Sequence, residues 1–449
     1  MRKEVFKLVK DKNERKSDKI EKSKATLKNS DKTNIVKNKT TKNKSRRTSV
    51  NTKTTQSKSD THTTENISIK KHQKIKITQH IITFIFLLFI FGMAILMFAL
   101  PKKDYSANEK RYLADMPQFS LQALFDKSFT TEVEEYITDH IPFRDFYVGT
   151  NAYYELVSGR NGSNGVYSGE DGYLINDPID ENNNVEKNIK VFADFVQQNN
   201  FNATLMVVPS TGYIADDKLP SLHKNYHDDE LFEIIDNNKG TMDFIDLRDI
   251  FKEEQQNGTQ LYYKTDHHWT SNAAYIGYKK ICENKGIKAT AKSDYYIEIY
   301  DKFKGTTYST SALWLNQSDN IELWQSIHLG EVSVEITENG TTSTYNNMLF
   351  KNHLVQSDKY PVYLDGNHAL TRIKNSNAPS NTRLLVIKDS FSHCLVPFLS
   401  DNYSEILMVD LRYYKDSVSQ LAKNEYFNDI LILYGLDNLA TDTNIAFLE

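Results

Sequence analysis

Residues 383–391 read RLLVIKDSF, and this stretch gives the clearest indication of the fold class. Leu384 to Ile387 form a short continuous apolar run, which is typical of a strand buried on both faces of a sheet. Similar runs occur at 203–210 (ATLMVVPS), 405–410 (EILMVD) and 429–435 (DILILYG), with helical patterns at 183–200, 271–286 and 417–425. This alternation predicts an α/β domain with a doubly wound parallel sheet.

The alternation is lost over residues 290–380, which are rich in Thr, Tyr and Asn and contain short strand-like runs such as VSVEIT at 332–337. We therefore predict a β-rich insertion within an α/β domain that covers residues 166–449. Residues 101–165 are polar and rich in aromatic side chains, and they form a separate entry segment ahead of that domain.

The first 80 residues differ sharply in charge from the rest of the chain. They carry 24 Lys and Arg against 8 Asp and Glu, whereas the other 369 residues carry 31 against 51. Residues 1–76 have few apolar clusters, so they cannot bury enough surface to offset chain entropy, and we predict a disordered basic tail. A basic tail can also bind nucleic acid, but the segment that follows argues against a nucleic-acid partner.

Residues 81–100 read IITFIFLLFIFGMAILMFAL and contain no charge. Twenty helical residues span about 30 Å, the hydrocarbon thickness of a bilayer. The end of the span and the residues after it, MFALPKK at 97–103, offer no good small-x-small cleavage site. We therefore expect an uncleaved single-pass anchor rather than a signal peptide. The lysines precede the span, which predicts a cytoplasmic N-terminus and an extracellular C-terminal domain at the cell membrane.

Two cysteines, Cys282 and Cys394, leave two readings open. An exported chain can form a disulfide between them. Cys282 lies in a helical pattern and Cys394 follows a buried strand, so two small buried thiols are equally consistent with the sequence.

The stretch YYKTDHHWT at 262–270 is the first candidate for chemistry. In an extended segment, residues i and i+2 share one face, so Asp266 would pair with His268, while His267 and Trp269 would point away. An Asp–His pair fixes the imidazole tautomer and leaves the far nitrogen free as a base. The alternatives are a packed histidine before a helix, or a metal site. Adjacent histidines on a strand diverge, so we expect no metal.

Ser390 is the second candidate, because it lies just beyond the strand 384–387. Ligands of open parallel sheets bind at the carboxyl ends of the strands, where a serine near a helix start can act as a nucleophile. The alternative is that Asp389 or Ser390 only caps the helix. His393 is a possible rival base, and His353 and His368 lie in the insertion without an acid at good spacing. Asn367 could donate to an oxyanion, although a turn role is open as well.

These residues resemble the signature of the DHHW proteins of Gram-positive bacteria, which are similar to the alginate O-acetyltransferase family with its SGNH-hydrolase-like domain. Softer matches are SANEKRYL (106–113), DHIPFRD (139–145), GYL (172–174), VVPS (207–210), YLDGN (363–367) and KDSF (388–391). The resemblance implies an SGNH-hydrolase-like sheet and a catalytic Ser390–His268–Asp266 triad. His267, Trp269 and Asn367 are then candidates for substrate or oxyanion contacts. Lys388 departs from the family, which usually has Gly before the Asp-Ser pair.

The function that the resemblance implies is O-acetyl transfer to a cell-envelope polysaccharide, without a cofactor. A separate multi-span membrane acyltransferase would supply the acetyl group. Two alternatives stay open: an acetyl esterase that uses the same triad, and a non-catalytic envelope-glycan-binding or scaffold protein.

Overall fold

The N-terminal region contains one long apolar helix. The computed structural model describes residues 60–179, 184–338 and 340–448, so residues 1–59 of the predicted tail lie outside the described part. Helix α2 (Asp60–Ala99) starts earlier than the predicted span, and residues 60–76 are helical instead of disordered. Its segment Lys76–Ala99 has 24 residues and a mean hydropathy of 2.9, long and apolar enough to cross a membrane. Such a helix is consistent with a single membrane anchor or a signal sequence.

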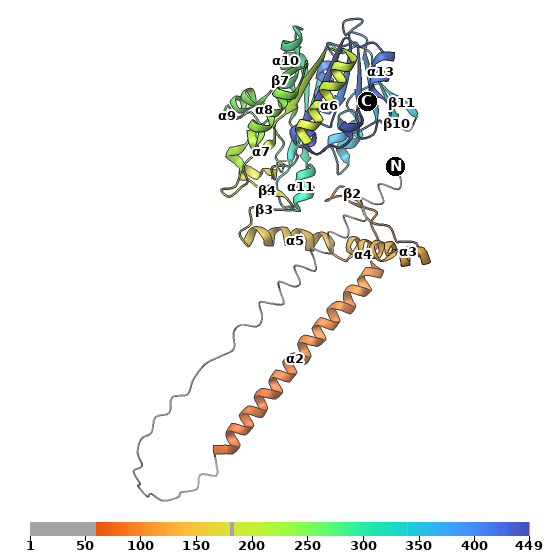
Figure 1. The fold of residues 1–449 in the computed structure, drawn as a ribbon. Coiled ribbons are helices and arrows are strands. Elements are labelled where there is room, and N and C mark those ends of the chain that lie inside the picture. Colours follow the sequence, from red (N-terminus) through yellow and green to blue (C-terminus); the bar gives the residue numbers. More distant parts are fainter. Residues whose placement is uncertain (1–59, 180–183, 339, 449) are drawn as a thin grey trace, which may run out of the picture. The chain divides into compact units, whose positions relative to one another are not determined.

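An eight-stranded sheet with the order β11-β10-β12-β14-β13-β15-β6-β7 forms the centre of the fold (Figure 1). Its strands are β6 (Ala203–Val208), β7 (Asp243–Asp246), β10 (Val332–Glu338), β11 (Thr341–Tyr345), β12 (Leu370–Asn375), β13 (Arg383–Lys388), β14 (Glu405–Val409) and β15 (Asp429–Gly435). β14, β13, β15, β6 and β7 are parallel, as predicted. β12, β10 and β11 continue the sheet in antiparallel pairs. The predicted α/β class is confirmed, with a sheet that is mixed instead of wholly parallel.

The segment 290–380 contributes to two sheets. Its strands β10, β11 and β12 form the antiparallel edge of the main sheet, whereas β8 (Tyr295–Phe303) and β9 (Asp319–Ser326) pair with each other. Helix α11 (Thr306–Ser311) lies between β8 and β9 in the sequence. The regular alternation of helix and strand is lost in this segment, as expected where neighbouring strands pair in antiparallel.

Helices cover both faces of the main sheet. Along β13, Leu384 and Val386 pack into one apolar cluster and Leu385 and Ile387 into another, because successive side chains point to opposite faces. The first cluster includes residues of α9 (Arg248–Gln256), α10 (Ser271–Lys285) and α12 (Ser392–Leu399). The second includes residues of α6 (Asn184–Asn199), α8 (Asp228–Asn238), α13 (Val418–Asn424) and α14 (Leu436–Thr441). Each fully buried aliphatic side chain contributes about 1.5–3 kcal/mol relative to exposure.

The entry segment is tied together by ion pairs. Its elements are β1 (Tyr105–Ser106), β2 (Arg111–Tyr112), α3 (Leu121–Phe125), α4 (Ser128–His140) and α5 (Arg144–Val157), followed by the small sheet of β3 (Gly162–Ser163), β4 (Val166–Ser168) and β5 (Leu174–Asn176). Arg111 binds both carboxylate oxygens of Asp139, and its hydrogen bond lowers the pKa of that carboxyl to about 2. Arg144 pairs with Glu109. The motifs at 106–113 and 139–145 are therefore partners of each other.

Both cysteines are free and buried in the structure. The Cys394 thiol lies 3.7 Å from the Tyr360 hydroxyl and the Cys282 thiol 3.9 Å from Asn402 Oδ1. Burial raises the pKa of each thiol to about 12. The sequence left open a disulfide or two buried thiols, and the structure contains two buried thiols.

Helix α10 packs closely on α12 through Gly277. The helix has Thr270 as its N-cap and Gly286 in the left-handed conformation at its end. A Cβ atom at Gly277 would lie 3.2 Å from the Trp269 ring and 3.3 Å from a Leu395 methyl carbon. A larger side chain there would force these neighbours apart.

We expect Gly277→Val to reduce the free energy of unfolding by about 1–3 kcal/mol, as overpacked core sites do. Urea unfolding followed by the fluorescence of the buried Trp269 measures the change. Lys279→Val on the exposed side of the same helix is the matched control, and it should cost no more than about 0.5 kcal/mol through helix propensity. Equal losses in the two variants would show that the α10–α12 contact is not tight.

Candidate active site

Ser390 lies in a turn between β13 and α12 that Asp389 organises. The Asp389 carboxylate accepts hydrogen bonds from the Phe391 N–H at 2.9 Å and from the Gly435 N–H at 2.8 Å. Asn438 donates a third at 2.8 Å. A Cβ atom at Gly435 would lie 2.4 Å from the Phe391 ring, so this approach requires glycine. Asp389 therefore joins the ends of β13 and β15 and fixes the residues on both sides of the serine.

The histidine stretch is a bent loop, and the prediction of an extended segment is wrong. Tyr262 and Trp269 form an antiparallel bridge at its ends. Within the bend, the His268 N–H donates to Asp266 Oδ1 at 2.9 Å. This is the local turn that Asp side chains make two residues ahead of themselves. The Asp266–His268 pair was thus expected for the wrong reason, because a turn and not a shared strand face brings the two residues together.

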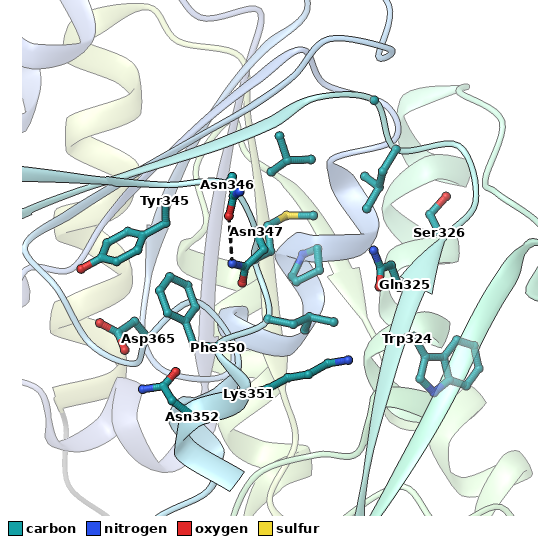
Figure 2. Close-up of a pocket in the computed structure, with 16 residues that line it drawn as sticks. Trp324, Gln325, Ser326, Tyr345, Asn346, Asn347, Phe350, Lys351, Asn352 and Asp365 are labelled. Atoms are coloured by element: carbon teal, nitrogen blue, oxygen red, sulfur yellow. Dashed lines mark hydrogen bonds between the residues drawn. The ribbon is translucent and has the colours of Figure 1, made fainter.

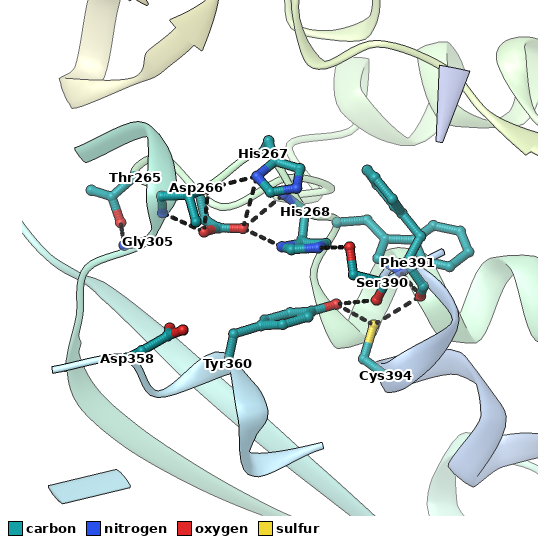
Figure 3. Close-up of polar contacts among 12 residues, drawn as sticks. Thr265, Asp266, His267, His268, Gly305, Asp358, Tyr360, Ser390, Phe391 and Cys394 are labelled. Atoms are coloured by element: carbon teal, nitrogen blue, oxygen red, sulfur yellow. Dashed lines mark hydrogen bonds and ion pairs between the residues drawn. The ribbon is translucent and has the colours of Figure 1, made fainter. Parts of the chain in front are cut away.

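Asp266, His268 and Ser390 form one hydrogen-bonded chain (Figure 3). The Nδ1–H of His268 donates to Asp266 Oδ1 at 2.5 Å, and His268 Nε2 accepts from the Ser390 hydroxyl at 2.7 Å. All three side chains are buried. This geometry allows the imidazole to take the hydroxyl proton while the carboxylate holds the ring in the required tautomer.

Residues of α11 hold the Asp266 carboxylate. Its Oδ2 accepts from the Thr306 N–H at 2.6 Å and from the Thr306 hydroxyl at 3.1 Å. Gly305 lies so close that a Cβ atom there would come within 2.1 Å of the carboxylate. Burial acts to raise the pKa of Asp266, but the charges of His268 and His267 and the hydrogen bond from His268 outweigh it and hold that pKa well below its usual value. Asp266 is therefore an anion at every physiological pH.

Tyr360 covers the other side of the imidazole. Its ring stacks on His268 with centroids 3.9 Å apart and planes 9° from parallel, and its hydroxyl donates to the Ser390 carbonyl at 3.3 Å. Neither Tyr360 nor Thr306 was among the site residues expected from the sequence. They lie 92 and 38 residues from His268, in a segment with no spacing that links them to it.

His267 and Trp269 occupy positions that differ from the prediction. The His267 ring does not point away, since its centroid is 3.9 Å from that of His268 and its Nδ1 lies 2.6 Å from the Thr306 hydroxyl. Desolvation lowers the pKa of His267 to about 4, so it is neutral at pH 7. Trp269 is 0% exposed and donates its indole N–H to the Phe391 carbonyl at 2.9 Å. It positions the serine turn and is closed to substrate.

The bent loop brings potential metal ligands together. Asp266, His267 and His268 each place one ligand atom within 4.8 Å of the others, so the premise of diverging histidines was wrong. These atoms are nevertheless engaged in the site, because His268 bonds both Asp266 and Ser390 and His267 bonds Thr306. A metal ligand would need a free nitrogen lone pair at His268. The hydrogen bonds fit a proton relay better than a metal centre.

Asn367 and the other three histidines have different partners. Asn367 is exposed, and its amide oxygen accepts from Arg412 at 2.9 Å, so within the described contacts it does not reach the serine. His393 accepts from Lys388 at 2.7 Å. The other two have acid partners after all, at 2.5 Å between His353 and Asp365 and 2.6 Å between His368 and Glu338. These acids lie 12 and 30 residues away in the sequence, so local spacing does not indicate the pairs.

Lys388 carries a buried ion pair directly before the serine turn. Its side chain is 2% exposed, and its ammonium donates to Asp410 Oδ2 at 2.8 Å and to His393 Nε2 at 2.7 Å. Burial lowers the pKa of Lys388, and the Asp410 charge opposes that shift. Its φ is not positive, so a side chain fits this position without the strain that glycine relieves. The lysine replaces glycine without distorting the backbone.

Two cavities bear on binding. A small one beside the relay is lined by Leu174, Ile175, Asn176, Ser210, Thr211, Gly212, Tyr226, His267, Thr307 and Asp437. The larger, about 880 Å³, lies between β9 and the β10–β11 hairpin, where aromatic and amide side chains gather (Figure 2). Trp324, Tyr345 and Phe350 supply its rings, and Gln325, Asn346, Asn347 and Asn352 its amides. No member of the relay lines it.

Comparisons with known proteins agree with this fold. The family model described as DHHW protein matches residues 233–409, and no curated protein matches the chain. A DHHW family protein from Eubacterium siraeum is similar at 20% identity and a TM-score of 0.54, over 63% of this chain and 95% of that one. Bacillus cereus PatB1, solved with a sulfonyl adduct, is similar at 23% identity and a TM-score of 0.55. The similarity covers 62% of this chain and 97% of that one.

A weaker likeness is to the O-acetyltransferase domain of Pseudomonas putida AlgJ, at 14% identity and a TM-score of 0.39, over 62% of this chain and 93% of that one. The family match contains the Asp266–Trp269 signature, Thr306, Tyr360 and Ser390. Over residues 233–409, this chain is therefore similar to the DHHW protein family.

Proposed function

We propose that this protein is an O-acetyltransferase acting on a cell-envelope polysaccharide through Ser390, His268 and Asp266. The observation that carries the proposal is the continuous hydrogen-bonded chain from the buried Asp266 carboxylate through His268 to the Ser390 hydroxyl. A serine hydroxyl is a weak nucleophile until an adjacent base removes its proton, and this arrangement supplies the base and its orienting acid.

The proposed reaction has two half-reactions. His268 Nε2 takes the Ser390 proton while Oγ attacks the acetyl carbonyl, and the donor leaves with that proton. A sugar hydroxyl then loses its proton to His268 and attacks the acetyl-serine, which frees Ser390 and gives the O-acetyl sugar. Asp266 stays ionised and stabilises the imidazolium in both half-reactions. Water in place of the sugar would make the same residues an acetyl esterase.

The second candidate function is glycan binding without catalysis, favoured by the 880 Å³ cavity. Rings such as Tyr345 offer flat apolar faces, and amides such as Asn347 both donate and accept hydrogen bonds, which suits sugar hydroxyls. The two candidates are compatible, because a transferase needs to hold its polysaccharide acceptor.

We also propose the setting in which the reaction occurs. Helix α2 would stay uncleaved as a single-pass anchor, with the basic tail in the cytoplasm and residues 101–449 outside the cell. A multi-span membrane acyltransferase would then deliver acetyl groups from inside. The support is the apolar helix segment Lys76–Ala99 and the excess of lysine before it.

The catalytic proposal predicts that Ser390→Ala, His268→Ala and the double variant lose activity equally. Each should reduce acetyl transfer by about 10⁴–10⁶, without additivity, because the residues act as a unit. Hydrolysis of 4-nitrophenyl acetate measures the rate, and phenylmethanesulfonyl fluoride should leave a sulfonyl ester on Ser390 that mass spectrometry locates. An adduct at another residue, or none in the unaltered protein, would contradict the proposal.

Substitutions of His267 and His268 should have clearly different effects on sulfonylation. His268→Ala should abolish sulfonylation, whereas His267→Ala, which loses the bond to Thr306 and a ring contact with His268 but leaves the His268–Ser390 bond in place, should stay within about tenfold, or about 1.4 kcal/mol in barrier. Sulfonylation that survives in His268→Ala and is lost in His267→Ala would assign the base role to His267.

A further prediction concerns glycan binding in the 880 Å³ cavity. Binding is measured in a Ser390→Ala background to prevent turnover. Tyr345→Ala should weaken binding of a soluble cell-wall oligosaccharide fraction by about fivefold or more, the usual effect of removing an aromatic anchor. Tyr345 is 38% exposed, and Tyr426→Ala, at an exposed site outside the cavity, is the control. Calorimetry gives both affinities. If Tyr345→Ala binds as tightly as the control, the cavity is not the glycan site.

A further inference from the structure

Helix α5 exposes an apolar stripe along its outer face. Phe146 is 67% exposed, Tyr154 68% and Val157 87%, and Tyr147 and the preceding Phe143 are also exposed. Residues three, four and seven apart lie on one face of a helix, so 143, 146, 147, 154 and 157 form a continuous row. The remaining exposed residues, Thr150 and Asn151, are polar but uncharged. The outer face thus carries no ionised side chain.

The inner face of α5 is already occupied. Val148, Ala152 and Leu156 pack in an apolar cluster with residues of α11 and the turn after it, including Tyr308, Ala312 and Leu313. The ionisable residues of α5 are paired away from the stripe: Arg144 with Glu109, Asp145 with Asn108 and Glu155 with Arg160. The domain therefore holds α5 firmly and leaves its apolar face outward. Exposed aromatic side chains in one row mark an interaction site.

The chain itself indicates what lies next to this face. Helix α2 ends at Ala99, and Asn108 already donates a hydrogen bond to Asp145 in the first turn of α5 at 2.9 Å. Residues 100–108 can span at most about 30 Å when fully extended. If α2 crosses a bilayer, the start of α5 is within that distance of the membrane surface.

We propose that the outer face of α5 lies in the headgroup layer of the bilayer that α2 crosses. Aromatic rings in this layer have an apolar body and, in Tyr147 and Tyr154, a polar tip, as in the aromatic belts of membrane proteins. The region outside the tail is acidic, with 31 Lys and Arg against 51 Asp and Glu, so apolar insertion and not attraction to anionic lipid drives the contact. The inference rests on the proposed anchor topology.

This contact would set the position of the candidate active site. The inner face of α5 packs on α11, and Thr306 at the start of α11 bonds the Asp266 carboxylate. A docked α5 would therefore hold the Ser390 relay one helix away from the lipid surface. An acetyl donor that emerges from the membrane would reach the serine without crossing open solvent.

The test uses the full chain in phosphatidylcholine vesicles, with a nitroxide label on Phe146→Cys, Tyr154→Cys or Val157→Cys in turn. Cys282 and Cys394 are buried, and the unsubstituted chain checks that they take no label. Tyr426→Cys, at a site 73% exposed outside the stripe, is the control. Collisions with oxygen, which concentrates in lipid, are compared with those of a water-soluble nickel chelate.

At the three stripe positions, the ratio of oxygen to nickel collisions should be severalfold higher than at Tyr426→Cys, and 1 M salt should leave it unchanged. Ratios equal to the control would overturn the proposal. So would labels shielded from both reagents, with dipolar broadening that disappears on dilution into more lipid, because a second copy would then cover the stripe.

The sulfonyl adduct on Ser390, measured in the same vesicles, separates this proposal from the catalytic one. An adduct together with water-exposed labels would support the catalytic proposal and contradict the membrane contact. Lipid-exposed labels without an adduct would support the membrane contact and contradict the catalytic proposal. If the purified chain lacks α2 through cleavage, the anchor topology fails, and the membrane contact fails with it.

Discussion

The buried negative charge of Asp266 is the constraint on which the site depends. A carboxylate inside a protein is costly unless hydrogen-bond donors and a positive partner surround it. Here the donors come from two parts of the chain: the bent loop, through the N–H and the ring of His268, and the start of α11, through Thr306. Removing any of them would leave a buried charge with unmet bonding capacity. The loop, the insertion and the serine turn are therefore fixed relative to one another by one side chain.

The parts of this arrangement that follow local rules could be predicted from the sequence. Apolar runs such as 384–387 indicate buried strands. Thr270 and Gly286 are typical helix-end residues, and they lie at the two ends of α10. The place of Ser390 beyond a parallel strand follows from topology alone. Each of these signals sits within a few residues of the feature that it specifies, so a single sequence contains them in full.

The parts that depend on long-range packing were missed or misjudged. Tyr360 reaches His268 from 92 residues away, and nothing in YPVYLDG indicates a ring stacked on an imidazole. A bend at Asp266 replaces the extended backbone that was expected for this stretch, because the aspartate satisfies the His268 N–H. Asn367 was considered for its chemistry, but Arg412 engages its oxygen. Residue type indicates which interactions these side chains can make, but tertiary contacts determine which partners they bind.

Lys388 connects the serine turn to its surroundings through a buried charge. Its ammonium lies between Asp410 at the end of β14 and His393 in α12, so one buried cation links the strand beside β13 to the helix after the serine. Asp389 makes a parallel link to β15 through the Gly435 N–H. Two consecutive residues thus fasten the serine turn to both neighbouring strands, and the charge on Lys388 is balanced where it lies. A glycine could allow closer backbone approach, but it could not make the first of these links. The serine turn in this chain is accordingly held by side-chain charges on one side and by backbone hydrogen bonds on the other.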